Sequence, residues 1–149
     1  MRQSDLRNLF VLSAASTVLA VTSSAWAVSA PPPPEKHYGS VAYATGGIAQ
    51  DEAARFRRLM DRYPLAIELL EKSGRKDEYT ADAAVKIVDR AGRTVLDARA
   101  EGPYMLVRLA PGRYDVKAEL GGRTLRKSNV EVRKGASAQA VFEFPPHTG

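Results

Sequence analysis

The chain has 149 residues, with 22 Lys and Arg against 17 Asp and Glu, and it contains no cysteine. The net charge of +5 is of the size that keeps a small domain soluble, so it does not by itself indicate a polyanionic partner. Without cysteine the chain can form neither a disulfide nor a cysteine-linked lipid anchor. A hydrophobic core must therefore hold the fold.

The first 27 residues have the pattern of a secretory signal peptide. Arg2 and Arg7 precede an apolar run that begins at Leu9 and ends with small residues at Ala25 and Ala27. We expect cleavage after Ala27, a periplasmic or secreted protein of the bacterial envelope, and no stable membrane span after cleavage. The alternative is a retained membrane anchor, because the apolar run is nearly long enough to span a bilayer.

Two segments are predicted before the main domain. Residues 28–43 form a linker, because the four prolines at 31–34 favour the stiff polyproline II conformation; a ligand for a proline-binding domain is the alternative. Residues 44–64 form a helical segment, with Gly46 and Gly47 as a flexible joint before the helix and Pro64 as its end. The apolar face of this helix is Ala49, Ala53, Phe56, Met60 and Tyr63.

Residues 65–144 consist of short apolar or alternating runs separated by turn residues, a pattern that predicts strands. The buried face of the clearest run is Tyr114, Val116, Ala118 and Leu120. Before it, Pro111 and Gly112 have the chemistry of a type II turn with a positive φ at Gly112. Because that turn twists the wrong way for a tight hairpin, the chain is expected to change sheets here. The prediction is a mainly β sandwich of seven strands, preceded by one short amphipathic helix and followed by a tail at 145–149.

The sequence offers few groups for catalysis. His37 and His147 both lie beside prolines outside the predicted sandwich, where nothing would orient them as a general base. The run G-A-S-A-Q at 135–139 resembles a nucleophile elbow without its final glycine or its following helix, so a turn is the better interpretation. Two histidines without metal-ligand spacing do not make a metal site. We expect no enzymatic activity, no cofactor and no bound metal.

Five basic residues gather on the last predicted hairpin and are opposed only by Glu131. They are Arg123, Arg126, Lys127, Arg133 and Lys134. One interpretation is that they contact an anionic polymer or a membrane surface. The other is that they protect an exposed sheet edge from pairing with another chain. Nucleic acid is not expected, because the chain is predicted to be exported and no aromatic residues alternate with these charges.

The stretch 102–116, G-P-Y-M-L-V-R-L-A-P-G-R-Y-D-V, resembles the G-x-Y-x-L-x-x-L-x-P-G-x-Y-x-V signature of carboxypeptidase regulatory-like domains. The strand and turn with Val85, Ile87, Asp89 and Gly92 fit the same family. The resemblance implies a transthyretin-like (prealbumin-like) sandwich of immunoglobulin-like layout over residues 65–144, with a non-catalytic role. The whole chain also resembles small exported proteobacterial proteins that carry this domain. The related hydroxyisourate hydrolases use histidines on strands and a C-terminal Tyr-Arg-Gly-Ser, neither of which this sequence supplies.

These observations favour a non-catalytic exported module that binds or supports another cell-envelope protein, with pairing along an exposed strand edge as the route. The alternative is an adaptor that binds an anionic envelope polymer or the cell wall through the basic hairpin. A transthyretin-like hydrolase comes third. The sequence carries no signal for the oligomeric state.

Overall fold

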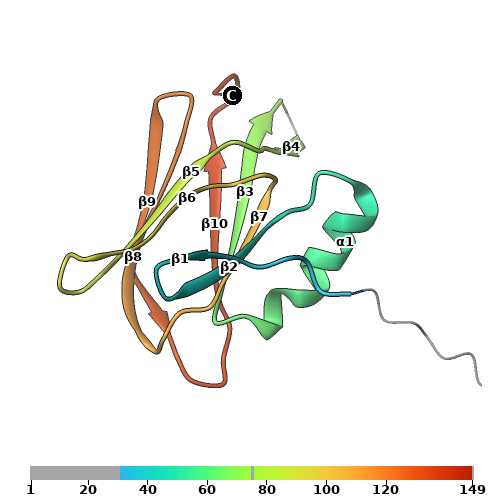
Figure 1. Cartoon of the computed structure of the whole chain (residues 1–149). Helices are drawn as coiled ribbons and strands as arrows, with labels where there is room; N and C mark the ends of the chain where they lie inside the picture. The colour runs from blue at the N-terminus through green and yellow to red at the C-terminus, as the bar shows by residue number, and fades with distance from the viewer. Residues whose placement is uncertain (1–30, 75, 149) are drawn as a thin grey trace, which may run out of the picture.

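A computed structural model describes residues 31–74 and 76–148 of the chain (Figure 1). The predicted signal peptide, with Ala25 and Ala27, lies outside these residues. The described residues form two β-sheets packed against each other and one short helix that precedes most of the strands. The prediction of a mainly β sandwich with one short helix is therefore confirmed.

One sheet has six strands and the other has four. The first has the order β1-β2-β7-β3-β10, with β4 paired to the last residues of β3. Its strands are β1 (Lys36–Tyr38), β2 (Val41–Gly46), β3 (Leu65–Ser73), β4 (Lys76–Tyr79), β7 (Tyr104–Val107) and β10 (Ala138–Phe144). The second sheet has the order β6-β5-β8-β9. Its strands are β5 (Ala84–Asp89), β6 (Thr94–Arg99), β8 (Gly112–Leu120) and β9 (Arg123–Val132).

Three strands of the six-stranded sheet, β1, β2 and β4, are additional to the seven that the sequence predicted. Two of them occupy residues 36–46, where the sequence predicted a linker and a flexible joint. Strand β2 is held by β7, with Tyr43 opposite Val107 and Gly46 opposite Tyr104. Such short strands depend on the partner they pair with, which local residue patterns do not reveal.

The main core lies between the two sheets and includes the alternating face of β8 that the sequence predicted. The six-stranded sheet contributes Leu65, Ile67, Leu69, Met105, Val107, Ala140, Phe142 and Phe144 to it. A second, smaller core lies on the opposite face of this sheet, beneath helix α1 (Gln50–Leu59). There Phe56 stacks on Tyr104 with 6.0 Å between the ring centroids. Helix α1 thus covers the outer face of the six-stranded sheet (Figure 1).

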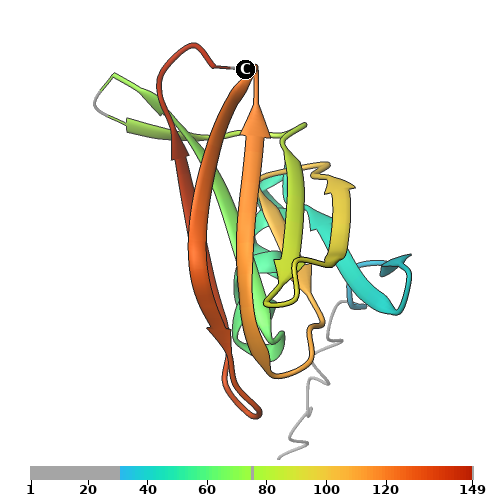
Figure 2. The same cartoon turned by 90° about the vertical axis from the view of Figure 1, so that its left-hand side faces the viewer.

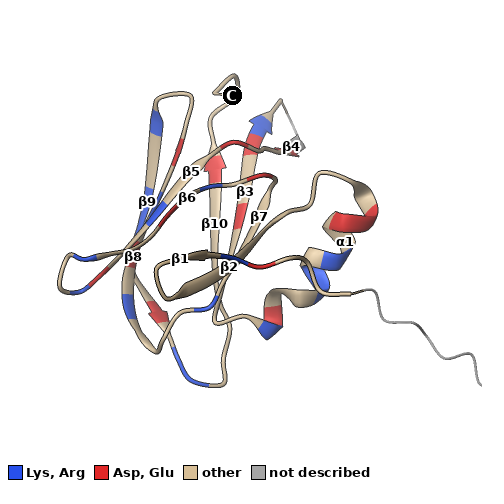
Figure 3. Cartoon of the chain, viewed as in Figure 1, with Lys and Arg blue, Asp and Glu red and all other residues tan. Residues whose placement is uncertain are grey.

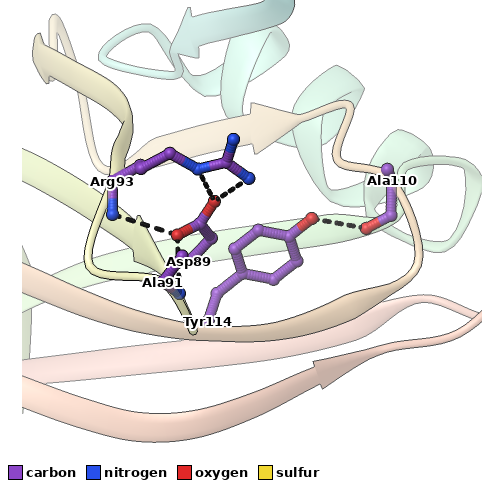
Figure 4. Close-up of polar contacts among 5 residues, drawn as sticks. All are labelled: Asp89, Ala91, Arg93, Ala110 and Tyr114. Carbon is purple, nitrogen blue, oxygen red and sulfur yellow. Dashed lines mark hydrogen bonds and ion pairs between the residues drawn. The ribbon is translucent and has the colours of Figure 1, made fainter.

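The chain changes sheets between β7 and β8, as the sequence predicted. The predicted type II turn at Pro111 and Gly112 is wrong, because Gly112 lacks the positive φ that such a turn needs and is already the first residue of β8. The crossing is held instead by Tyr114, whose hydroxyl donates to the carbonyl oxygen of Ala110 at 2.7 Å (Figure 4). This contact has the geometry of the tyrosine corner of β-sandwiches. Burial raises the pKa of Tyr114, so the hydroxyl remains a donor.

The turn between β5 and β6 is organised by Asp89 (Figure 4). Its Oδ1 accepts the backbone N–H groups of Ala91 and Arg93 at 2.9 and 3.0 Å, and its Oδ2 accepts Arg93 Nε at 2.9 Å. These hydrogen bonds, chiefly the one from the Arg93 backbone, lower the pKa of Asp89. Gly92 completes the turn with φ +79. Both residues therefore have structural roles.

Gly121 and Gly122 join β8 to β9 with φ values of +52 and +77, as predicted for a tight hairpin. The C-terminal tail lies against this hairpin. Thr148 donates its backbone N–H to Oε1 of Glu71 at 2.8 Å, and a Cβ on Gly121 would collide with the carbonyl oxygen of Thr148. The tail therefore closes the hairpin end of the sandwich.

Gly102 and Gly112 differ in how closely other atoms approach them, so their alanine variants should differ in stability. A Cβ at Gly102 would collide with the backbone carbonyl of Gly46, whereas a Cβ at Gly112 would meet only Tyr114 ring atoms at 3.5 Å or more. Gly102→Ala should reduce the free energy of unfolding by about 1–3 kcal/mol, the usual cost of overpacking. Gly112→Ala should change it by less than about 0.5 kcal/mol.

Urea unfolding of the two variants beside the parent chain measures both values. Equal stabilities for the two variants would contradict the packing of residues 101–103 against β2.

Candidate functional site: the open side between strands β9 and β10

Strand β10 is the last strand of its sheet, and among the described residues only one of its edges is paired. It runs parallel to β3 without a break, from Ala138 opposite Leu65 to Phe144 opposite Glu71. The Ala138 N–H donates to the carbonyl oxygen of Pro64 at 2.9 Å. Along an extended strand, successive residues direct their N–H and C=O groups to opposite sides. The even-numbered residues therefore pair with β3, and the backbone groups of 139, 141 and 143 point to the other edge.

Strand β9 is the corresponding last strand of the four-stranded sheet and lies beside β10 (Figure 2). The two strands belong to different sheets and leave a groove of about 440 Å³ between them. The groove is lined by Leu125, Arg126, Lys127, Val141, Phe142 and Glu143. We call it the β9–β10 groove. Lys127 Nζ lies 5.9 Å from the ring centroid of the buried Phe142, within cation–π range, so a positive charge lies between the groove and the core.

The two edges that flank the groove differ in chemistry. Strand β10 has the sequence A-Q-A-V-F-E-F, with no Lys, Arg or Pro and no irregularity in its register. Strand β9 is basic, and its register with β8 shifts between Tyr114 and Val116. At this bulge Asn129 has φ +56 and donates its backbone N–H to Oδ1 of Asp115 at 3.0 Å. Charge, bulges and inward-pointing Lys are the features that discourage edge pairing, so β9 is protected and β10 is not.

The structure spreads the five predicted basic residues along β9 and the turn after it (Figure 3). Arg123 begins the strand, and Arg133 follows its end, about 30 Å away at the usual rise per residue. Arg126 and Lys127 are neighbours that point to opposite faces; Arg126 Nη2 lies 3.8 Å from Asp115 Oδ2 on the outer face. The five side chains therefore do not form one basic patch.

Arg133 and Lys134 lie at the other end of the sandwich, where they line a separate depression of about 360 Å³. Arg62 and Asp61 line the same depression. Arg133 Nη2 donates to Oε2 of Glu131 at 2.9 Å, which partly neutralises it. Three basic side chains and one carboxylate thus surround this end depression.

His147 lies in the tail that follows Pro145 and Pro146, as the sequence predicted, whereas His37 lies in a strand. His37 is the central residue of strand β1 and is exposed. His147 is exposed with φ +61 in the tail that Thr148 fixes against Glu71. Within residues 31–74 and 76–148, no three His, Asp or Glu side chains gather as metal ligands.

A buried tyrosine lies beneath helix α1. The Tyr104 hydroxyl is fully buried and has no hydrogen-bond partner among the described residues. Its ring lies 5.6 Å from that of Tyr79, whose hydroxyl accepts a hydrogen bond from Arg57 Nη1 at 3.3 Å. Burial raises the pKa of Tyr104, so its hydroxyl stays neutral and does not act as a base at physiological pH.

The sequence did not indicate a polar cluster that holds the N-terminal segment to the sandwich. Glu35 Oε1 accepts hydrogen bonds from the Tyr63 hydroxyl at 2.6 Å and from Arg108 Nε at 2.7 Å. The Arg108 guanidinium also lies 4.3 Å from the Tyr63 ring centroid. Tyr63 and Arg108 lower the pKa of Glu35, while burial and Glu35 raise the pKa of Tyr63 to about 12. No short motif joins three residues so far apart in the chain.

Among the described residues, no helix is long and apolar enough to cross a bilayer. Comparison of the chain with protein-family models, with curated proteins and with solved structures finds no match.

The Glu35 cluster predicts a specific acid sensitivity. Because the folded state lowers the pKa of Glu35, its contribution to stability is present above the ordinary pKa of a glutamate carboxyl, 4.5, and is lost as the pH falls below it. Glu35→Gln should lower the free energy of unfolding by about 0.5–1 kcal/mol at neutral pH, as for partly exposed ion pairs. When the pH is then lowered, the free energy of unfolding of this variant should fall by less than that of the parent chain.

Urea unfolding between pH 7 and pH 3 measures this difference. Asp61→Asn is the matched control, since Asp61 is an exposed carboxylate without an ion pair among the described residues. Parallel pH profiles for Glu35→Gln and the parent chain would contradict the assigned role of Glu35.

Proposed function

We propose that this protein is a non-catalytic, exported β-sandwich module that binds another cell-envelope protein by pairing with the free edge of β10. One observation carries the proposal: β10 is a seven-residue strand whose second edge no other described strand pairs, and this unprotected edge lies beside an open groove. Extended segments bind such edges through backbone hydrogen bonds, while adjacent pockets select their side chains.

The resemblance to carboxypeptidase regulatory-like domains supports the non-catalytic part of the proposal. The signature residues have structural explanations: Tyr114 holds the crossing between sheets, Asp89 orders a turn, and Gly102 lies against the backbone of β2. We include in the proposal that the fold is of the transthyretin-like kind and that the chain reaches the bacterial envelope through its predicted signal peptide. A hydrolase role receives no support from His37 or His147, which lie in different elements.

A second candidate function is binding of an anionic envelope polymer. The end depression lined by Arg62, Arg133 and Lys134 favours it, because three cations surround one space of about 360 Å³. Contacts of this kind are screened by salt, whereas strand pairing over apolar side chains persists at moderate ionic strength. Salt dependence therefore separates the two candidates.

The test is affinity capture with the predicted mature chain, residues 28–149, from a cross-linked envelope extract of the source cells. We expect one protein to be retained through a wash at 0.5 M salt. Val141→Pro removes a backbone N–H that points to the free edge, and proline is tolerated at such edge positions. This variant should lose the captured protein, while Val141→Ala, which keeps the N–H, should retain it.

Thermal unfolding shows whether Val141→Pro remains folded; Glu143→Pro, nearer the end of the strand, replaces it if it does not. Capture that is equal with Val141→Pro and Val141→Ala would reject docking at β10. Retention of polymer alone, lost at 0.5 M salt, would favour the second candidate instead.

A further inference from the structure

We propose that the segment bound at β10 is an acidic extended strand, whose carboxylates face Lys127 across the β9–β10 groove. This inference rests on the proposed function and goes further by specifying the chemistry of the partner. Its basis is the composition of the two groove walls: β10 supplies free backbone groups, and β9 supplies positive charge.

The backbone of β10 fixes how the partner lies. The N–H and C=O groups of Gln139, Val141 and Glu143 point away from β3, so an added strand would extend the six-stranded sheet by one position. Neighbouring strands lie about 4.8 Å apart. Because β9 lies close to β10 at this side of the sandwich, a strand added here would also lie beside β9, with alternate side chains directed towards the groove.

The positive charge on β9 determines which side chains of the partner strand would fit the groove. Val116 lies opposite Lys127 and Ala118 opposite Leu125, so Lys127 and Leu125 share the face that looks towards the other sheet. Lys127 has no carboxylate within ion-pair distance among the described residues, and its ammonium group lies near the Phe142 ring. On the other wall, Glu143 is already paired with Lys72 Nζ at 3.6 Å. The uncompensated charge beside the groove is thus positive, and carboxylates of the partner would complement it.

The same charge argues against a second copy of this chain as the occupant. Two β10 strands paired about a twofold axis would also bring the two β9 strands towards each other. Each copy would then bring its Lys127, which has no carboxylate within ion-pair distance among the described residues, towards the other copy. Like charges brought together in this way disfavour association. The groove would therefore bind an acidic partner in preference to a second copy of this chain.

The experiment uses two synthetic nine-residue peptides with blocked ends, one alternating valine with glutamate and one alternating valine with lysine. Alternation gives each peptide one charged face and one apolar face. Isotope-labelled mature chain is titrated with each peptide and followed by NMR. We expect the Val-Glu peptide to shift the signals of 139–143 and 125–127, and the Val-Lys peptide to bind at least tenfold more weakly.

Variants test each wall of the groove. Val141→Pro should abolish binding of the Val-Glu peptide, and Lys127→Gln should weaken it roughly threefold, the effect of one partly exposed charge pair. Lys86→Gln is the matched control, because Lys86 lies on the outer face of the four-stranded sheet and is paired with Asp97. It should leave the affinity unchanged.

Equal affinities of the two peptides would overturn the inference, as would shifts confined to the end depression around Arg133. Self-association of the unliganded chain that Val141→Pro abolishes would identify a second copy as the occupant and would also overturn it. If neither peptide binds but Val141→Pro still abolishes capture from the envelope extract, the proposed function stands and only the acidic character of the partner is rejected.

Discussion

The parallel ladder between β3 and β10 is the interaction on which the rest of the structure depends. It joins the first strand after the helix to the last strand of the chain over seven residues in unbroken register. It places Phe142 and Phe144 in the main core, where each fully buried aromatic contributes roughly 1.5–3 kcal/mol by apolar burial. Because this ladder uses only one edge of β10, the opposite backbone edge, beside β9, is left unpaired within residues 31–74 and 76–148.

Strands β9 and β10, which lie side by side at this side of the sandwich, differ in the features that oppose edge pairing. Strand β9 combines basic residues, a bulge at Asn129 and the inward-facing Lys127, which together oppose pairing with a further strand. Strand β10 has none of these features and alternates apolar with neutral or acidic residues. The protected strand thus lies directly beside the unprotected one. This arrangement suits a groove that accepts one kind of strand and repels others.

Local patterns were sufficient to predict much of this fold from sequence. The alternation in β8 and the glycine hairpin at Gly121 and Gly122 are confirmed, since each depends on residues close together in the chain. The change of sheet before β8 is confirmed as well, although the type II turn from which it was inferred does not form. The type II turn at Gly112 was wrong because a side chain, Tyr114, determines the backbone there. Strands β1, β2 and β4 were missed because long-range pairing defines them.

The candidate site could not be predicted from the sequence, because it too depends on long-range strand pairing. Counting along the chain places five basic residues on one hairpin, but alternation sends Arg126 and Lys127 to opposite faces, and strand length separates Arg123 from Arg133. The free edge of β10 follows from its pairing with β3, about seventy positions earlier in the chain, which no motif records. The Glu35 cluster likewise joins residues from three distant segments.

Native-state hydrogen exchange of the backbone amides of β10 tests the central claim most directly. If one edge is paired and the other is free, exchange should alternate along the strand. The amides of Ala140 and Phe142 should exchange slowly, near the rate of global unfolding, and those of Val141 and Glu143 should exchange quickly. Uniform protection along β10 would contradict the account, because it would mean that both edges are already paired in the isolated chain.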